Sequence, residues 1–294
     1  MANGGLVIFA GPGELAHHAL SRLVRRGPSI DTVVWSGYGN VSKNVDPRFP
    51  VNPPRSLPGL IDTAVKFGLS IVPWAEFLAH RNRRIEFAPR CGLVLCFPQR
   101  LPAEITRLPT YGCFNIHPSL LPRYRGPSPL FWQFYNGERD GGVTVHRVTE
   151  NIDAGPIIAQ QRMGLHAGLD YAQAQRRFAT LGVDLFAECY TQITAGRMNA
   201  VPQHEPDASY YPAPTQRDWI ITHDWRAERA YRFICAMIAE CGPLRMRIEN
   251  AVVEISAMHG FDINMIQPEP LVRLGDLLRI RCCPGTITVS GLVL

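Results

Sequence analysis

The run Gly112-Cys-Phe-Asn-Ile-His-Pro-Ser-Leu-Leu-Pro122 carries more information about fold and function than any other stretch of this chain. Asn115 and His117 stand two residues apart in an apolar setting, so on a strand both side chains would leave the same face and converge on one atom. Asp153 follows 36 residues after His117. An amide, an imidazole and a carboxylate in this order predict an active site.

The interval between His117 and Asp153 has its own pattern. It begins with a proline-glycine loop, Arg123-Tyr-Arg-Gly-Pro-Ser-Pro129, and continues through a helical stretch that ends at Asn136. The run Gly142-Val-Thr-Val-His-Arg-Val148 follows, and its alternation predicts a strand. The acidic residue is thus expected on a loop that follows this strand.

The first hundred residues alternate between short apolar runs and helical patterns, which predicts βα units around a parallel sheet. We expect strands at residues 6–10, 32–36, 69–72, 92–97 and 113–117, helices at 14–25 and 60–67, and a long Pro-rich loop at 37–58. The residue pair Asn115 and His117 would then lie at the carboxyl end of the fifth strand. In open α/β sheets, ligands bind at that edge.

The second half of the chain predicts two further parts. Strands at residues 143–148 and 156–163 are expected to pair as an antiparallel extension, and a helix over 170–194 would have Asp170 near its cap. Residues 201–218 contain four prolines and read as a linker. A helix at 227–240 and strands at 245–248, 251–255, 277–282 and 286–292 complete the prediction.

The expected fold class is therefore α/β, with a Rossmann-like, mostly parallel sheet and a smaller β-rich C-terminal domain. Residues 1–200 would form the catalytic domain, 201–218 the linker and 219–294 the second domain. With 294 residues of which 46% are hydrophobic, the chain can bury one substantial core. No apolar run approaches 18 residues and the start lacks a basic leader, so we expect a soluble, cytoplasmic protein without a membrane partner.

Charge and cysteine usage exclude several classes of protein. The net charge is +5, carried by 28 arginines and only two lysines, but residues 219–294 hold eight arginines and eight acidic residues. A nucleic-acid arm would instead show a basic stripe there, so nucleic acid is not the expected partner. The eight cysteines form no CxxC pair. We expect reduced thiols and no metal.

The order and spacing of these motifs resemble the catalytic segment of the formyltransferases that use 10-formyltetrahydrofolate. That family includes glycinamide ribonucleotide transformylase, methionyl-tRNA formyltransferase and the sugar N-formyltransferases. The resemblance extends over residues 6–194 in the order of elements and is sharpest over 112–158. It implies the formyltransferase fold, a formyl-donor cosubstrate, 10-formyltetrahydrofolate, and a catalytic trio of Asn115, His117 and Asp153.

The resemblance also implies how the formyl donor binds. In the family, two loops close over the pteridine ring and recognise it largely through main-chain groups. The matching residues are Phe97, Arg100 and Leu101 on the loop before the catalytic strand, and Thr149, Glu150 and Ile152 on the loop that carries the aspartate.

Three further positions indicate a function less specifically than the trio does. Thr144 matches a family position that helps to hold water near the aspartate, although a β-branched residue on a strand needs no such role. His146 would share the face of Thr144 and is given no role. Leu121-Pro122 lies where the family often has a cis peptide.

The trio has the groups that formyl transfer requires. An amine must attack a carbonyl carbon, a negative oxygen forms, and the incoming nitrogen must lose a proton. The amide of Asn115 and the imidazolium of His117 would donate to that oxygen, and preorganised donors of this kind contribute on the order of 3 kcal/mol each. Asp153 would orient the ring of His117 or relay the proton.

The motifs indicate the formyl acceptor less specifically than the formyl donor. The run 125–130 and the C-terminal extension are most similar to the sugar and methionyl-tRNA branches. The balanced charge of 219–294 favours the primary amine of a small molecule, either an amino-sugar nucleotide or a biosynthetic amine. Methionyl-tRNA formyltransferase is the alternative. The second domain would then serve homodimer contact or shape the acceptor pocket.

Two functions of other classes are alternatives to formyl transfer. A 10-formyltetrahydrofolate hydrolase would need only water in place of the amine, and a catalytically silent folate-binding protein would not need the trio. Gly11-Pro-Gly13 is similar to the start of a dinucleotide fingerprint, but residue 16 is alanine where the third glycine should be. NAD binding is therefore the poorer interpretation. Ser119 lacks the Gly-x-Ser-x-Gly turn of a serine nucleophile.

Overall fold

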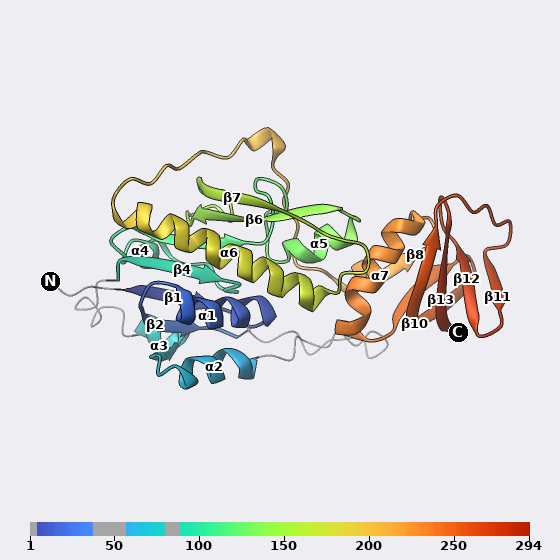
Figure 1. Ribbon diagram of the computed structural model, residues 1–294, viewed down its shortest axis with the longest axis horizontal. Helices are drawn as coiled ribbons and strands as arrows, with labels where there is room; N and C mark the ends of the chain where they lie inside the picture. The colour runs from blue at the N-terminus through green and yellow to red at the C-terminus, as the bar shows by residue number, and fades with distance from the viewer. Residues whose placement is uncertain (1–4, 38–56, 80–88) are drawn as a thin grey trace.

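A computed structural model describes residues 5–37, 57–79 and 89–294 of the chain, which form two sheets joined end to end (Figure 1). The first sheet has seven strands in the order β3-β2-β1-β4-β5-β6-β7. Strands β1 to β5 run parallel, and β6 and β7 extend the sheet antiparallel. Their bounds are Leu6–Ala10, Ile30–Trp35, Ile71–Pro73, Cys91–Leu95, Cys113–His117, Asp140–Arg147 and Ile157–Gly164, in order from β1 to β7.

Helices cover both faces of this sheet, because its central strands are apolar on both sides. In β1, Leu6 and Ile8 pack into the core beneath α1, Glu14–Arg26, and α6, Tyr171–Thr194, together with residues of α2, Leu57–Lys66. The alternating residues Val7 and Phe9 face a second cluster with α3, Trp74–Ala79, and α4, Ala103–Thr106. This period of two fixes which side chains of β5 point toward α6 and which point away from it.

The second sheet lies at the other end of the molecule. Its order is β11-β12-β13-β10-β9-β8, mostly antiparallel. The strands are β8 Ile220–Thr222, β9 Leu244–Ile248, β10 Ala251–Asp262, β11 Leu271–Leu274, β12 Leu277–Arg281 and β13 Thr286–Val293. Helix α7, Ala227–Cys241, buries its apolar side, including Phe233 and Ile234, against this sheet and the neighbouring layer. The fold confirms the predicted α/β class with a smaller β-rich part.

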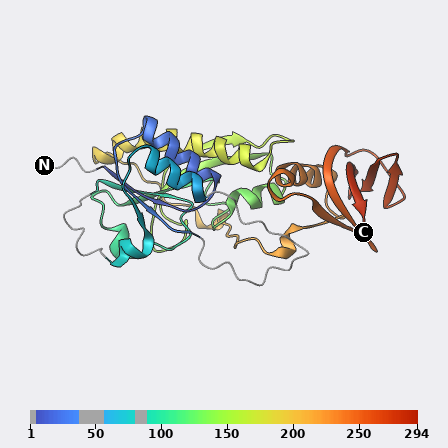
Figure 2. The ribbon, with the colours of Figure 1, turned by 90° about the horizontal axis from the view of Figure 1, so that it is seen from below.

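Aromatic rings join the two parts. Helix α5, Pro129–Tyr135, presents Phe131 and Tyr135 to α7, where Phe131 lies 5.6 Å from Phe233 between ring centroids. Tyr135 also packs edge-on to Trp225 at 4.9 Å. Aromatic pairs at such distances stabilise packing beyond simple burial of area. The second sheet therefore docks on the first part through α5 (Figure 2).

Several predicted elements differ from the structure. The strands predicted at 32–36, 69–72 and 92–97 are shifted by one or two residues, and the short elements α3, α4, β8 and β11 were not expected. Each of these has six residues or fewer, too short for a clear hydrophobic period. The predicted loop 37–58 lies almost entirely outside the described residues, and α2 begins at Leu57.

Residues 201–218 are more than a simple connection. Val201 pairs with Ile157 of the first sheet, and short 3-10 turns occupy Glu205–Asp207 and Gln216–Trp219. The boundaries 1–200, 201–218 and 219–294 stay a prediction. In space, however, the predicted linker lies along the first sheet before the chain enters β8.

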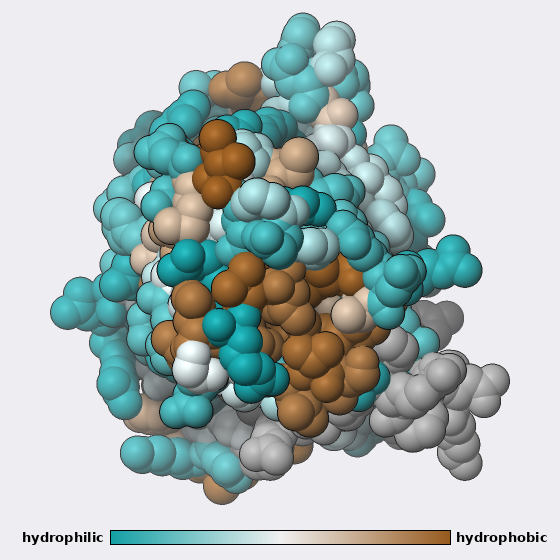
Figure 3. Space-filling view, turned by 90° about the vertical axis from the view of Figure 1, so that its right-hand side faces the viewer, coloured by the Kyte–Doolittle hydropathy of each residue, from teal (hydrophilic) through white to brown (hydrophobic). Residues whose placement is uncertain are grey.

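The far end of the molecule is formed by the second sheet, and Figure 3 looks onto it. Apolar and polar atoms are mixed on this face, with apolar atoms gathered near its centre. The exposed large apolar side chains of this part are Phe261, Ile263, Ile266, Leu274, Leu292, Val293 and Leu294. Among the described residues, no helix is both long and apolar enough to cross a membrane.

Candidate active site

Strand β5 positions the first two predicted residues. Phe114 and Ile116 are buried toward α6, so Asn115 and His117 point to the opposite side of the sheet. The side chain of His117 is only 4% exposed. Both residues also lie opposite β6, where Asn115 is the partner of His146 and His117 the partner of Thr144. The antiparallel neighbour thus adds side chains to the same site.

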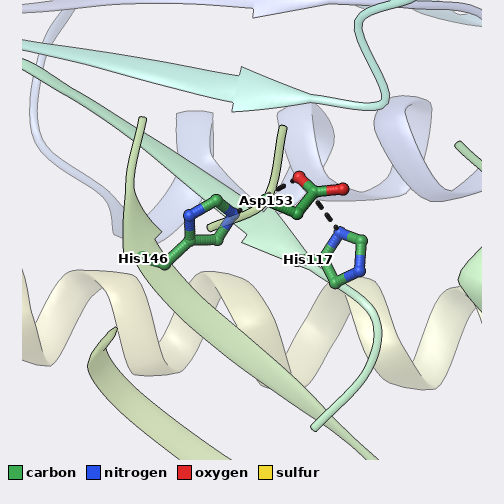
Figure 4. Close-up of side chains that lie close together, drawn as sticks. All are labelled: His117, His146 and Asp153. Carbon is green, nitrogen blue, oxygen red and sulfur yellow. Dashed lines mark ion pairs between the residues drawn. The ribbon is translucent and has the colours of Figure 1, made fainter. Parts of the chain in front are cut away.

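Asp153 reaches the same place from the loop after β6 (Figure 4). Its Oδ1 lies 3.7 Å from Nδ1 of His117 and accepts a hydrogen bond from Nδ2 of Asn115 at 3.4 Å. Its Oδ2 accepts from the backbone N–H of Gly126 at 2.8 Å. The three residues predicted from the sequence therefore meet around one carboxylate oxygen.

The ring of His117 is held from behind by the loop after β5. Its Nε2 lies 2.8 Å from the carbonyl oxygen of Tyr124 and donates to it. That carbonyl is aimed by an unusual backbone, since Tyr124 has a φ of 62° in the left-handed region. With Nε2 committed to this bond, Nδ1 is the nitrogen that faces Asp153.

His146 is the fourth member of the site. Its Nε2 lies 3.2 Å from Nδ2 of Asn115 and 3.6 Å from Oδ1 of Asp153. Burial lowers the pKa of His146 to about 4, the charge of Asp153 opposes this shift, and His117 adds to it. The ring is therefore neutral near pH 7. Its Nδ1 donates to the carbonyl of Arg147 at 3.0 Å, which leaves Nε2 to accept from Asn115.

The same side chains have the composition of a metal site. Ligand atoms of His117, His146 and Asp153 all lie within 4.8 Å of one another. Two imidazoles and one carboxylate are ligands that zinc and other transition ions accept. The expectation of no metal came from cysteine spacing, which gives no information about a set of this kind.

The chain is similar to known proteins over most of its length. The family described as formyl transferase matches residues 85–189, which include all four side chains. Methionyl-tRNA formyltransferase of Citrifermentans bemidjiense is 31% identical over 228 residues, 76% of this chain and 67% of that protein. The protein of the same name from Kosmotoga olearia is 28% identical over 208 residues, 70% of this chain and 67% of its own.

The chain belongs to the formyltransferase family. This confirms the family that the sequence motifs predicted.

Solved structures support the fold over the whole chain. An N-formyltransferase from Helicobacter canadensis, described in complex with folinic acid and dTDP-3-aminofucose, gives a TM-score of 0.68 at 18% identity and covers 98% of this chain and 99% of its own. WlaRD, described as a sugar 3N-formyl transferase, gives 0.66 at 18% identity and covers 99% and 98%. At this identity the similarity concerns the fold, including the second sheet of this formyltransferase-family chain.

The loops predicted to hold the folate lie side by side. On the first loop, Phe97 packs against Phe9 and Trp74, and Leu101 is buried in the same cluster. Arg100 donates from Nη2 to the carbonyl of Glu150 on the second loop, so the two loops are joined directly.

Two cavities border these loops. One, of about 420 Å³, is lined by residues that include Arg100, Glu150 and Ile152 of the predicted folate set and Arg125, Glu205 and Tyr210. The other, of about 260 Å³, includes Thr149 and Glu150. The larger volume falls within the roughly 300–1,000 Å³ typical of small-molecule sites. Four of the six predicted folate residues therefore line open space, whereas Phe97 and Leu101 pack beneath it.

Thr144 is tied to the loop after β5. It is fully buried, and its hydroxyl donates to the carbonyl of Ser119 at 2.6 Å while accepting from the N–H of Leu121 at 3.1 Å. It thus fastens that loop, and the role that the resemblance implied for it stays a prediction. The Leu121-Pro122 bond in that loop is cis.

Sequence reasoning missed three contributors to this site. His146 was given no role, although its place two residues after Thr144 on a strand was visible. Gly126 acts through its backbone N–H, and Gln203 comes from the segment that read as a linker. Neither of these last two carried a signal, because backbone donors and distant side chains are identified only by the folded chain.

Proposed function

We propose that this protein is an N-formyltransferase that moves the formyl group of 10-formyltetrahydrofolate to the primary amine of a small molecule. The observation that carries this proposal is the meeting of Asn115, His117 and Asp153 around one carboxylate oxygen, with donor–acceptor separations of 3.4 and 3.7 Å. This set lies at the carboxyl end of β5, the edge at which ligands of open α/β sheets bind.

The donor supplies the formyl carbon, whose bond to N10 breaks as the acceptor nitrogen forms its own bond, while one proton passes from that nitrogen to N10. The side chains of this site fit those needs. Nδ1 of His117, and the hydrogen of Asn115 Nδ2 that here goes to Oδ1 of Asp153, would turn to the negative oxygen of the intermediate as donors. Asp153 accepts the proton from the attacking nitrogen, and His117 beside it completes the relay.

The neutral state of His146 suits this mechanism. A protonated His146 would compete with His117 for the charge of Asp153. A neutral ring instead accepts one hydrogen bond from Asn115 and fixes the direction of its amide. We assign His146 the role of orienting Asn115.

A cavity lined by residues of the two predicted folate loops supports a folate donor. The cavity of about 420 Å³ is lined by Arg100 of the first loop, by Glu150, Asn151, Ile152 and Ala154 of the second, and by Arg125, Glu205 and Tyr210. Residues 152 and 154 flank Asp153 in the chain, so this space adjoins the loop that carries the carboxylate. Phe97, Arg100, Leu101, Thr149, Glu150 and Ile152 stay the proposed folate contacts.

Charge pairing in residues 219–294, on α7 and the second sheet, favours a small amine as acceptor. Arg232, Arg245 and Arg281 are each engaged with an acidic side chain, Glu228, Glu254 and Glu249 respectively. Arg229 lies over the ring of Trp225 at 3.7 Å and is half-buried. A surface for transfer RNA depends on cations that are free to neutralise phosphates. Half of the eight arginines in residues 219–294 are thus already occupied.

Methionyl-tRNA formylation is the second candidate, because the curated relatives at 28–31% identity carry that name. The acceptor assay separates the two candidates. The protein is incubated with 10-formyltetrahydrofolate and, in separate reactions, amino-sugar nucleotides, free amino acids and charged initiator tRNA. Tetrahydrofolate release and formylated product are both followed.

The outcomes are distinct. Product with a small amine and none with tRNA supports the proposal. Formylmethionyl-tRNA as the product establishes the second candidate instead. Tetrahydrofolate released at the same rate without any acceptor identifies a hydrolase, and no release under any condition, with folate still bound, identifies a folate-binding protein. His117→Ala is run beside each reaction to show that the turnover comes from this site.

A further inference from the structure

Residues 201–211, which we call the strap, run across both catalytic loops. At one end, the N–H and carbonyl of Val201 exchange two hydrogen bonds of 2.8 Å with Ile157. At the other end, Ser209 accepts from the N–H of Arg125 at 2.8 Å, and Tyr211 donates to the carbonyl of Arg125 at 2.9 Å. The strap therefore connects the loop after β5 with the start of β7, and between these ends it passes the loop after β6.

Gln203 is the strap residue whose side chain bonds the main chain of Asp153. Its Nε2 donates to the carbonyl of Asp153 at 2.7 Å and to the carbonyl of Gly155 at 2.8 Å, so both amide hydrogens are used. Asp153 has a φ of 52°, in the left-handed region that non-glycine residues adopt at a cost. The hydrogen bonds of Gln203 thus hold the turn in which this conformation occurs.

Arg125 fixes the direction of the Gln203 amide. Its Nη2 and Nε donate to Oε1 of Gln203 at 2.8 and 3.1 Å, and its other contacts are with the carboxylate of Glu205. A guanidinium has no acceptor, so the oxygen of Gln203 must face Arg125 and the NH2 group must face the carbonyls. Arg125 is only 8% exposed, which protects this arrangement from water.

The side chain of Asp153 is held from the opposite direction. Gly126, the residue after Arg125, donates its N–H to Oδ2 at 2.8 Å, which leaves Oδ1 for His117. The dipeptide Arg125-Gly126 therefore supports Asp153 in two ways. The N–H of Gly126 bonds the carboxylate directly, and the side chain of Arg125 supports the main chain of Asp153 through Gln203. The carboxylate and its backbone are set by the same loop.

We propose that Gln203 is a positioning residue for catalysis: supported by Arg125, it holds the main chain of Asp153 so that Oδ1 stays beside Nδ1 of His117. The role rests on the proposed function, since it matters only if Asp153 acts in formyl transfer. It makes the segment that leads to the second sheet part of the active site. Misplacement of a catalytic group by about 1 Å can cost on the order of a hundredfold in rate.

The activity test uses Gln203→Ala and Gln203→Glu, with Gln192→Glu as the matched control. Oε1 of Gln192 also accepts from an arginine, Arg197, at 3.3 Å, but on the exposed surface of α6. We expect kcat to fall at least tenfold in both Gln203 variants, with the donor KM changed less than threefold. Glutamate keeps an oxygen that can accept from Arg125, but it cannot donate to the two carbonyls. Gln203→Glu should therefore lose kcat as Gln203→Ala does. Gln192→Glu should keep its kcat.

A second measurement does not depend on activity. Amide hydrogen exchange of the peptide that covers residues 149–156 should be at least tenfold faster in Gln203→Ala than in the unmodified protein or in Gln192→Glu. Faster exchange together with a reduced kcat supports the proposal. A kcat within threefold of the unmodified enzyme, or unchanged exchange in this peptide, overturns it.

The two proposals fail in different ways. If the unmodified protein transfers no formyl group to any acceptor, the proposed function fails, and hydrogen exchange still reports whether Gln203 holds the Asp153 turn. If the unmodified protein is active and a folded Gln203→Ala retains its kcat, the positioning role fails and the proposed function stands. Thermal unfolding within about 5 °C of the unmodified protein, roughly 1–2 kcal/mol for a chain of this size, shows that the variant is folded.

Discussion

The region around β5 buries many polar side chains, whereas the second sheet leaves its ion pairs exposed. Among the described residues, six of the ten buried polar side chains lie between residues 117 and 146, and only Gln267 and Thr286 lie in residues 219–294, the part that contains the second sheet. The second sheet keeps its charges in water-exposed pairs such as Arg281 with Glu249. Burying polar groups costs free energy unless each has a partner. The region that bears this cost is the one that contains the catalytic candidates.

Left-handed backbone occurs in both regions, but its consequences differ. Tyr124 and Asp153 have left-handed φ values of 62° and 52°, and both contribute directly to the position of His117 or its partner. In the second sheet, Glu249 has a φ of 45° and lies in the tight connection between β9 and β10. There the left-handed conformation only reverses the direction of the chain. Strain combined with buried polarity, and not strain alone, distinguishes the site.

The largest difference between the two regions should appear on removing the proposed catalytic side chains. We expect His117→Ala, Asp153→Ala and Asn115→Ala each to lower kcat by about a hundredfold or more while folate binding is largely kept, because they act on charge that develops in the transition state. His259→Ala is the matched control, since His259 is an exposed histidine of the second sheet bonded to Ser290 at 2.7 Å. Steady-state kinetics and direct folate titration measure both properties. Near-normal kcat in all three variants would rule out the trio.

Alanine at two glycines should separate a packed loop from an open turn. At Gly126, with a φ of 115°, a Cβ would come within 2.0 Å of the carbonyl oxygen of Tyr211. At Gly242, with a φ of 77°, nothing lies within 4 Å. We expect Gly126→Ala to lower the free energy of unfolding by about 2–3 kcal/mol and Gly242→Ala by about 1 kcal/mol, the conformational cost alone. Equal losses in denaturant titrations would mean that the strap does not pack against this loop.

The buried histidine should make stability depend on pH. Burial lowers the pKa of His146 to about 4; the charge of Asp153 opposes this shift, and His117 and Arg125 add to it. As pH falls, the unfolded chain therefore takes up a proton at this histidine before the folded protein does. This contribution to stability is complete above pH 6.5 and is lost as pH falls toward 4, at a cost of about 3 kcal/mol. His146→Gln should reduce the difference in unfolding free energy between pH 7 and pH 5, whereas His259→Gln should not. Identical pH slopes for the two variants would contradict it.

The smallest effect concerns the acceptor and tests the second sheet. For a small amine, we expect the acceptor KM to change less than about tenfold between low and ~0.15 M salt, and initiator tRNA not to bind tightly at the higher value. Replacing Arg247 and Arg279 by alanine should leave that KM within about twofold, since phosphate neutralisation would not be involved. Tight, salt-sensitive tRNA binding that these substitutions weaken would instead favour methionyl-tRNA formylation.

The amino-acid sequence was sufficient where local pattern and chemistry coincide. Strand β5, Cys113–His117, has its predicted bounds, as do β1 and the capped start of α6, where Asp170 accepts from the N–H of Gln173 at 2.6 Å. The trio of Asn115, His117 and Asp153 was identified from residue types in the correct order. Short elements such as α4 and β8 were not predicted, because three or four residues contain too little of any hydrophobic period.

The sequence by itself determined the family, the fold class and which three side chains to examine, because these depend on motifs and periodicity written along the chain. Only the tertiary structure showed how the site is supported: His146 across β6, the N–H of Gly126, and Gln203 held by Arg125. Gln203 lies 50 residues after Asp153 and bonds its backbone carbonyl. Such contacts depend on three-dimensional distance and on main-chain groups common to every residue, so no local pattern can encode them.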